Sequence, residues 1–341
     1  MIIIFLVLAL VLTIAFAVAV GPFQISPLET WRIIIKNIPF LGSLVNDGSS
    51  GVEEVIILQF RLPRTIAAMT VGVALAVAGV VLQGLFRNPM AEPYLLGISS
   101  GAALGVAIAI GLGIRLSFLG ILDSMQLMAF IIALATVFVV YNVARTGPRV
   151  PMLTVLLAGI AMTSFLSAII SLIMITLGES LHALIFWLFG TFSGIKWSDV
   201  TISLPLITFG LFTILVFSRQ FNIMLLGEDE AQQLGVDTER LKKIMLIFAT
   251  LITATAVSIS GTIGFVGLVI PHIVRILVGP DHRILIPSSA LAGAIILVLC
   301  DTLARIIIQP AELPVGVLTA FFGAPFFLYL LRKKKGLGMR G

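Results

Sequence analysis

Residues 65–86 read TIAAMTVGVALAVAGVVLQGLF and contain no charged side chain. A helix needs roughly 20 apolar residues to cross the hydrocarbon core of a bilayer, so this stretch predicts a membrane span. Comparable apolar runs occupy residues 2–20, 95–114, 126–144, 152–177, 200–217, 244–261, 264–278, 285–307 and 315–331. The sequence therefore predicts an all-α membrane protein with about ten transmembrane helices, in which residues 1–341 form a single transmembrane domain.

The composition supports a bilayer environment. Of the 341 residues, 59% are hydrophobic and only 11% are charged, whereas soluble domains are about half apolar and a quarter charged. The net charge of +5 comes from basic residues at the ends of apolar runs. We assign these residues to membrane topology and expect lipid, not nucleic acid, around the chain. The single Cys300 and three widely separated histidines predict no metal site.

The distribution of basic residues predicts the orientation. An even number of spans places both termini on one side, and the tail Arg332, Lys333, Lys334 and Lys335 assigns that side to the cytoplasm. Of the 21 basic residues, 14 then lie at inner ends: these four together with Arg87, Arg145, Arg149, Arg219, Arg240, Lys242, Lys243, Arg275, Arg283 and Arg340. The outer side holds Arg32, Lys36, Arg61, Arg64, Arg115, Lys196 and Arg305. We expect a multi-pass protein of the plasma or inner membrane. Residues 2–20 lack a basic n-region, so we interpret them as the first span and not as a cleaved signal.

Small and hydroxylated residues recur at helical spacing. Gly97, Gly101 and Gly105 fall on one helix face, as do Gly72, Ala76 and Gly79, which predicts close helix packing in the membrane. Three serines follow the spacing i, i+3, i+7 on one face of the fifth span, and two interpretations stay open: they line a polar pathway, or they pack against another helix. These serines are Ser164, Ser167 and Ser171.

The most informative polar segment is 220–240, on the predicted cytoplasmic side. Glycine, three acids, four further residues and a second glycine follow one another: Gly227, Glu228, Asp229, Glu230, Ala231, Gln232, Gln233, Leu234 and Gly235. Acids stabilise the start of a helix, and a glycine commonly ends one. We therefore expect a short amphipathic helix outside the bilayer. The outer segment 178–198 is rich in aromatic residues and is either an outer gate or an interfacial anchor.

One acid lies deep in an apolar run. Asp301 precedes Arg305 by four residues, and either the two form a helix-surface ion pair or Asp301 takes part in an ion relay. The sequence shows no further chain of intramembrane acids. An ion-coupled secondary transporter is therefore the alternative function. The sequence also has no phosphate-binding G-x-x-x-x-G-K-[ST] loop, so we expect no ATP hydrolysis by this chain itself.

Four long strings resemble the FecCD permeases of type II ABC importers, which carry vitamin B12, haem and iron–siderophores. They are RLPRTIAAMTVGVALAVAGVVLQGLFRNPMAEPYLLG from Arg61, LGEDEAQQLGV from Leu226, GTIGFVGLVIPHIVRILVGPDHR from Gly261 and AELPVGVLTAFFGAPFF from Ala311. The resemblance implies the type II ABC importer permease fold, with ten helices per subunit. It also implies a second permease copy, most simply a homodimer, and two ATPase subunits that bind ATP and Mg²⁺. A substrate-binding protein would deliver a metal chelate to the outer face.

The resemblance further implies roles for particular residues. The segment Gly227–Gly235 would be the coupling helix that contacts the ATPase, with Glu228, Gln232 and Leu234 at contact positions. Arg61, Arg64 and Arg305 would dock acidic residues of the binding protein, which suits outer cations that run against the positive-inside trend. The cytoplasmic gate would map onto Asn88, Met90, Met152 and Leu153. Met152 and Leu153 depart from the polar residues of the vitamin B12 permease, so here the gate would be a hydrophobic constriction.

Overall fold

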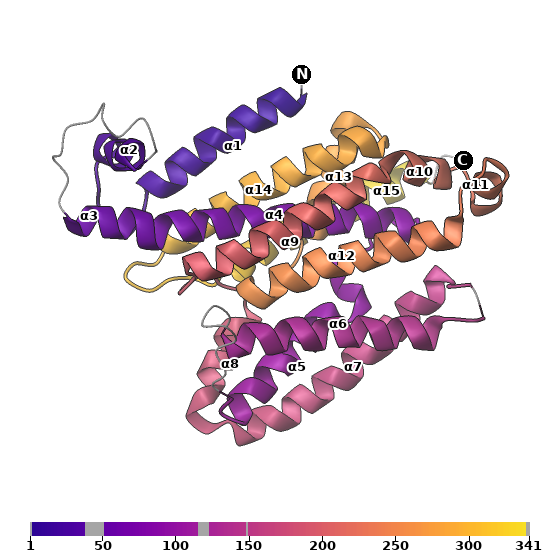
Figure 1. The fold of residues 1–341 in the computed structure, drawn as a ribbon, viewed down its shortest axis with the longest axis horizontal. Helices are drawn as coiled ribbons and strands as arrows, with labels where there is room; N and C mark the ends of the chain where they lie inside the picture. Colours follow the sequence, from indigo (N-terminus) through magenta and orange to yellow (C-terminus); the bar gives the residue numbers. More distant parts are fainter. Residues whose placement is uncertain (1, 38–50, 115–122, 148, 339–341) are drawn as a thin grey trace.

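The computed structural model describes residues 2–37, 51–114, 123–147 and 149–338, which form helices joined by short loops (Figure 1). The long helices are α1 (Ile2–Ala19), α4 (Leu62–Leu85), α6 (Ser124–Ala144), α7 (Met152–Thr176), α9 (Trp197–Val216), α12 (Thr238–Ser260), α14 (His282–Ile306) and α15 (Val315–Gly338). Shorter helices are α2 (Pro27–Lys36), α3 (Gly51–Val55), η2 (Ile56–Arg61), η3 (Pro93–Leu96), α5 (Ile98–Gly111), η4 (Gly178–Ser180), α8 (Leu181–Leu188), α10 (Ser218–Met224), α11 (Glu228–Gln233) and α13 (Val266–Val278). The described part of the chain contains no β-strand.

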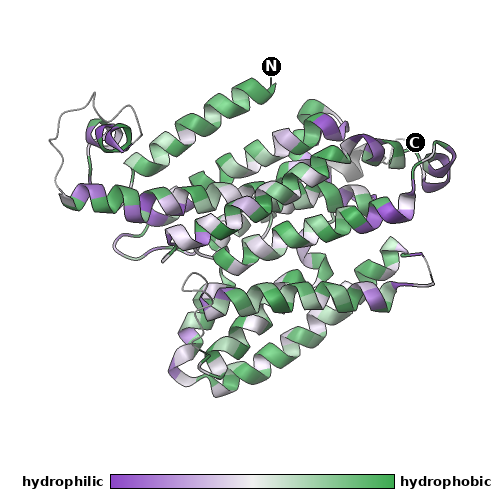
Figure 2. Ribbon diagram, in the orientation of Figure 1, coloured by the Kyte–Doolittle hydropathy of each residue, from purple (hydrophilic) through white to green (hydrophobic). Residues whose placement is uncertain are grey.

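The helices fit a multi-pass membrane protein. Seven helical stretches are long and apolar enough to cross a bilayer, with Gly51–Leu85 counted as one stretch. Three apolar helices are shorter, namely Ile98–Gly111, Val266–Val278 and the segment Val315–Tyr329 of α15. Each of the ten apolar runs coincides with one of these helices. Hydrophilic residues gather at the two ends of the bundle, around α2 and α3 at one end and around α10 and α11 at the other (Figure 2).

A single helix forms the centre of the bundle. The stretch from Gly51 to Leu85 is helical over 35 residues, and η2, which follows its first five residues, has the wider turns of a π-helix. Pro63 follows this wider segment and has no N–H to donate to the preceding turn, which gives the local irregularity a cause. Helix α4 is buried over most of its length and packs against α14, α12, α13 and α9.

Glycines let the neighbours of α4 come very close. A Cβ at Gly72 would lie 2.3 Å from the carbonyl oxygen of Gly293 in α14, and one at Gly79 would lie 1.9 Å from that of Gly267 in α13. Such distances leave no room for any side chain. The predicted packing role of these small residues is confirmed, because close backbone approach is how helices associate without a hydrophobic driving force.

A second group of helices lies beside the first (Figure 1). Helix α5 packs against α6 and α7, and α12 connects the two groups by packing against both α6 and α4. At Gly101 and Gly105 a Cβ would approach Thr136 and the carbonyl oxygen of Met128 in α6 to 2.3 Å, so this predicted packing face is also confirmed. Gly97 has φ +79° and begins α5.

The break between α12 and α13 shows how a short helix is accommodated. Helix α12 ends at Ser260 and α13 begins at Val266. The hydroxyl of Tyr94 donates to the carbonyl oxygen of Ile263 and accepts from the amide of Ile263 at 2.9 Å, and Thr191 donates its amide to Ser260. Non-helical backbone at membrane depth is tolerated only where protein groups pair with it. The apolar runs 244–261 and 264–278 thus form one full-length helix and one short one.

Candidate functional site

A groove of about 850 Å³ opens at the end of the bundle where α3 and η2 lie. Its walls combine apolar side chains, among them Phe60 and Trp197, with the charged residues Arg64, Lys196 and Glu312. The wall formed by residues 192–198 belongs to the aromatic-rich segment that the sequence assigned to the outer interface. The groove therefore combines an exposed charge at Lys196 with apolar side chains.

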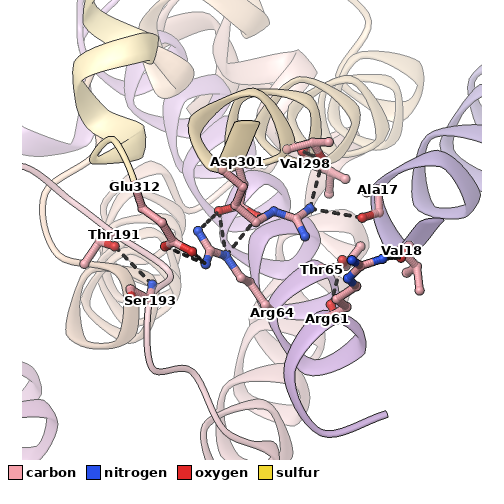
Figure 3. Close-up of polar contacts among 12 residues, drawn as sticks. Ala17, Val18, Arg61, Arg64, Thr65, Thr191, Ser193, Val298, Asp301 and Glu312 are labelled. Carbon is pink, nitrogen blue, oxygen red and sulfur yellow. Dashed lines mark hydrogen bonds and ion pairs between the residues drawn. The ribbon is translucent and has the colours of Figure 1, made fainter. Parts of the chain in front are cut away.

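Arg64 lies between two carboxylates at the base of this groove (Figure 3). Its Nη2 is 2.9 Å from Oδ1 of Asp301, and its Nη1 is 2.8 Å from Oε2 of Glu312. Asp301 also pairs with Arg305, whose Nε is 3.3 Å from Oδ2. The sequence offered two interpretations of Asp301, and one of them was a helix-surface ion pair with Arg305. The ion pair is present, but it is buried and Asp301 also binds Arg64, so it does not lie on the helix surface. With two cations on Asp301, this acid is not free to take part in an ion relay.

Arg61 and Arg305 hold the end of α1. The guanidinium of Arg61 donates to the carbonyl oxygen of Val18 at 3.0 Å (Figure 3). It also donates to the carbonyl oxygens of Ala19, at 2.9 Å, and of Phe23. Arg305 donates to the carbonyl oxygen of Ala17 at 3.1 Å. The last carbonyls of a helix have no partners of their own, and cations stabilise that end. These two side chains therefore satisfy the last turn of α1.

This arrangement bears on the three arginines predicted to dock a binding protein. All three line the groove, but Arg61 and Arg305 are buried and the side chain of Arg64 is only 11% exposed. Docking of a binding protein by these three arginines stays a prediction. Their partners within this chain screen the positive charge that they could present to a binding protein. Lys196 is exposed in the same groove. Sequence reasoning placed Lys196 on the outer side but did not include it among the docking residues.

One face of α7 is exposed along its whole length. Leu153, Leu157, Ile160, Ser164, Ser167 and Ser171 follow one another at alternating steps of four and three residues, and all are exposed. Ser164 and Ser171 donate to the carbonyl oxygens of Ile160 and Ser167 of their own helix. The structure thus joins the gate candidate Leu153 and the three serines into one stripe, apolar at its start and hydroxylated farther along. No helix among the described residues covers the stripe.

Of the remaining gate candidates, Asn88 and Met90 lie in the turn after α4, and Met152 is the first residue of α7. Asn88 follows α4, is exposed, and accepts the amide of Met90 at 2.9 Å. Met90 and Met152 are half-buried. Their role in a gate stays a prediction.

The short helix predicted within residues 220–240 is present as α11; its cytoplasmic location stays a prediction. It begins after Gly227 with three acids and is followed by Gly235 at φ +82°. Ala231 is buried against the bundle. Glu228 is bound to Nζ of Lys242 at 2.9 Å, and the amide of Gln232 donates to Thr238. Glu228 and Gln232, predicted as contact positions, therefore also fasten α11 to α12.

The outward side of this segment is apolar as well as acidic. Leu226 is 69% exposed and Leu234 is 63% exposed, with exposed Asp229, Glu230 and Gln233 between them. Two large exposed leucines thus lie at a polar end of the bundle, on either side of a helix of six residues.

Comparison with known proteins identifies the family. The model of the FecCD transport family matches residues 8–333. The chain belongs to the FecCD transport family. The cobalamin import system permease protein BtuC of Halobacterium salinarum is 46% identical over 288 residues, covering 84% of this chain and 76% of that protein. The hemin transport system permease protein HmuU of Yersinia pestis is 41% identical over 279 residues, covering 82% and 83%.

A solved structure is similar over almost the whole FecCD chain. It is described as an inward-facing conformation of a metal-chelate type ABC transporter, and it superimposes with a TM-score of 0.84 at 32% identity. The match covers 97% of this chain and 99% of that one. The all-helical fold expected for a FecCD permease is therefore the fold observed. The total number of membrane crossings depends on whether the three shorter apolar helices also cross the membrane.

The FecCD chain also contains a polar junction that sequence reasoning missed. Asn222 in α10 donates to Oδ1 of Asp281 at 2.7 Å and accepts both the amide and Nδ1 of His282 at 2.9 and 2.8 Å. Hydrogen bonds from Arg283 and Asn222 hold the pKa of Asp281 below its ordinary value. Nothing local marks Asn222, because its partners lie about 60 residues later. This junction ties α10, next to the α11 segment, to the start of α14.

Replacing Asn222 with alanine is expected to destabilise this junction by about 1–3 kcal/mol, because the buried ring of His282 loses its partner. Thermal unfolding of the purified protein in detergent measures the effect. Asn142→Ala is the matched control, since Asn142 is exposed and bonds only to the carbonyl oxygen of Phe138 in its own helix. Equal midpoints for the two variants would show that the junction contributes no stability.

Proposed function

We propose that this chain is the membrane permease subunit of an ATP-driven importer and forms the translocation pathway. The observation that carries the proposal is the placement of two different binding surfaces at opposite ends of one helix bundle. The groove at Arg64 and Lys196 lies at one end, and the α11 segment with Leu226 and Leu234 lies at the other. A permease subunit needs one surface to receive cargo and another to contact the ATPase whose conformational change drives transport.

The topology that fits this role has ten membrane crossings. Seven helical stretches meet the length and hydropathy of a span, and α5, α13 and α15 would complete the set because protein groups pair with the backbone where helices are short. The groove would then face outward and α11 the cytoplasm, with both termini cytoplasmic, in the plasma or inner membrane. The basic-residue bias of the sequence supports this orientation.

The partners follow from the two surfaces and the exposed stripe. Two ATP-binding-cassette subunits, which would bind ATP and Mg²⁺, would contact α11 on the cytoplasmic side. A substrate-binding protein would occupy the outer groove. A second copy of the chain would face the stripe from Leu153 to Ser171, so that two such stripes line a common pathway with an apolar inner end and a hydroxylated outer part. Closing of the ATPase pair would move the two α11 helices and change the angle between the two copies.

The cargo that fits is a metal chelate. The relatives named above are described as permeases for cobalamin and for hemin, and a further one, FhuB of Bacillus subtilis, as an iron(3+)-hydroxamate import permease. We propose an iron–siderophore, haem or corrinoid. An ion-coupled secondary transporter is not favoured, because Asp301 is paired with Arg64 and Arg305.

The contact with the ATPase can be tested by replacing both Leu226 and Leu234 with serine. Full burial of a leucine contributes about 1.5–3 kcal/mol, and about 1.4 kcal/mol corresponds to a tenfold change in affinity. We expect the double variant to bind a cognate ATPase subunit at least tenfold more weakly and to lose cargo-stimulated ATP hydrolysis. Affinity and hydrolysis are measured with the permease in nanodiscs.

A control separates this effect from a general loss of exposed apolar surface. Leu112 is 74% exposed and follows α5, at the end of the bundle opposite to α11 in the proposed topology. Leu112→Ser should leave ATPase affinity unchanged. If the Leu226 and Leu234 double variant also binds the ATPase with native affinity, the proposed contact is wrong.

A further inference from the structure

A second groove, of about 410 Å³, lies between α6 and α12. Its walls are mainly apolar and include Leu134, Phe138 and Tyr141 from α6 and Leu246 and Ile247 from α12. The lining positions on each helix are separated by three or four residues, so each helix presents one continuous face to the groove. Phe138 and Ile247 are exposed, which shows that the groove opens at the surface of the bundle.

The groove has a cationic mouth. Arg145, which directly follows α6, and Lys243, in the second turn of α12, both line it. The two helices are antiparallel neighbours (Figure 1), so these cations come from the same end of the groove. That end is the one near α11.

No acid among the described residues neutralises either cation. Arg145 donates its Nε to the carbonyl oxygen of Gly147, and within the described ranges neither Arg145 nor Lys243 has a carboxylate within ion-pair distance. Glu239, the acid one turn before Lys243, is bound to Lys242 at 2.6 Å and accepts the amide of Val150. Two exposed cations therefore remain available at the mouth of an apolar channel.

The length of the groove matches part of an acyl chain. From Lys243 to Thr250 the wall of α12 rises about 10 Å, and from Arg145 to Leu134 the wall of α6 rises about 16 Å, at 1.5 Å per residue. The hydrocarbon core of a bilayer is about 30 Å thick. The groove thus runs from the head-group level to about the middle of the membrane, in the direction in which lipid chains lie.

We propose that this groove binds one anionic phospholipid, with its phosphate head group at Arg145 and Lys243 and one acyl chain along Phe138 and Ile247. Basic pockets between transmembrane helices are suited to anionic head groups. Helix α6 packs with α5 and α7, whereas α12 packs with α4 and α9. The lipid would therefore bridge the two helix groups of the bundle. The proposal depends only on the chain being in a membrane and not on what it transports.

The test is a competition between two phospholipids with identical acyl chains, phosphatidylglycerol and phosphatidylcholine, for the purified full-length protein. Native mass spectrometry counts the lipids retained from equimolar mixed micelles. A cation near the membrane surface contributes about fivefold in affinity for an anionic lipid. Two cations predict a preference of roughly 25-fold for the first phosphatidylglycerol bound.

Three sets of variants locate the effect. Arg145→Gln with Lys243→Gln should reduce the preference to near unity. Arg219→Gln with Arg240→Gln removes the same charge from two exposed residues that do not line the groove, and should leave the preference unchanged. Ile247→Trp narrows the groove and should reduce retention of both lipids.

The proposal is overturned if the native protein retains the two lipids equally. It is also overturned if the Arg145 and Lys243 double variant keeps the native preference, or if the Arg219 and Arg240 variant loses as much of it. All four altered cations are exposed, and the thermal unfolding midpoint of each variant shows whether the fold is intact.

Discussion

Replacing Asp301 with alanine is expected to destabilise the protein by about 3–5 kcal/mol, which is the effect of removing one partner from a buried ion pair. Asp301 is almost completely buried and is the carboxylate shared by Arg64 and Arg305. Without it, buried Arg305 loses its ion-pair partner and keeps hydrogen bonds to two neutral groups, the carbonyl oxygen of Ala17 and the hydroxyl of Thr302. Arg305 also holds α1, so the loss should loosen α1 from α14. A lower thermal unfolding midpoint in detergent, with less monodisperse protein, is the expected observation.

Glu312→Ala is the matched control for this change. Glu312 also pairs with Arg64 but is 34% exposed, and exposed pairs contribute only about 0–1 kcal/mol. Asp301→Asn keeps the shape of the side chain and removes only its charge, so it should fall between the two. If Asp301→Ala and Glu312→Ala unfold at the same temperature, the buried cluster does not stabilise the fold as described.

Replacing Gly79 with alanine is expected to have a comparable effect. The new Cβ would lie 1.9 Å from the carbonyl oxygen of Gly267, and a backbone atom cannot rotate away as a side chain does. Overpacking of a core costs about 1–3 kcal/mol even where side chains relax, so we expect at least the upper end of that range. Helices α4 and α13 would have to separate, and α13 is the short helix that relies on its neighbours.

The control lies in the same continuous helix. A Cβ at Gly51 would meet no atom within 4 Å, and Ala is favoured over Gly in a helix by about 1 kcal/mol. Gly51→Ala should therefore leave the thermal unfolding midpoint unchanged or raise it slightly. A Gly79→Ala protein that unfolds at the native temperature would mean that the two helices are not in contact as the structure shows.

The helices were largely predictable because their signals are local. The apolar run at 65–86 is visible in any window of the sequence, and it coincides with α4. The acids after Gly227 and the stop at Gly235 likewise lie within a few residues of the helix that they delimit. What the runs alone did not settle was whether a helix as short as α13 crosses the membrane, since that depends on groups such as Tyr94 from another part of the chain.

The direction in which the outer arginines point was not predictable. Hydropathy shows that Arg61 stands at the end of a span, but its acceptors lie in the last turn of α1, about 40 residues earlier. The carboxylates on Arg64 lie more than 230 residues later. The positive-inside rule treats such cations as exceptions. In this structure, Arg61 and Arg64 are held by hydrogen bonds to carbonyls and carboxylates of the same chain.

The continuous helical stretch from Gly51 to Leu85 gives the protein one long, stiff element. At 1.5 Å per residue it is about 52 Å long, well beyond the roughly 30 Å of hydrocarbon. Arg64 lies about 20 Å along this stretch from Gly51 and lines the groove of about 850 Å³, and Arg87, just past the other end, donates to the carbonyl oxygen of Met224, beside α11. A tilt of the helix therefore displaces both places together, without a relay of side chains between them.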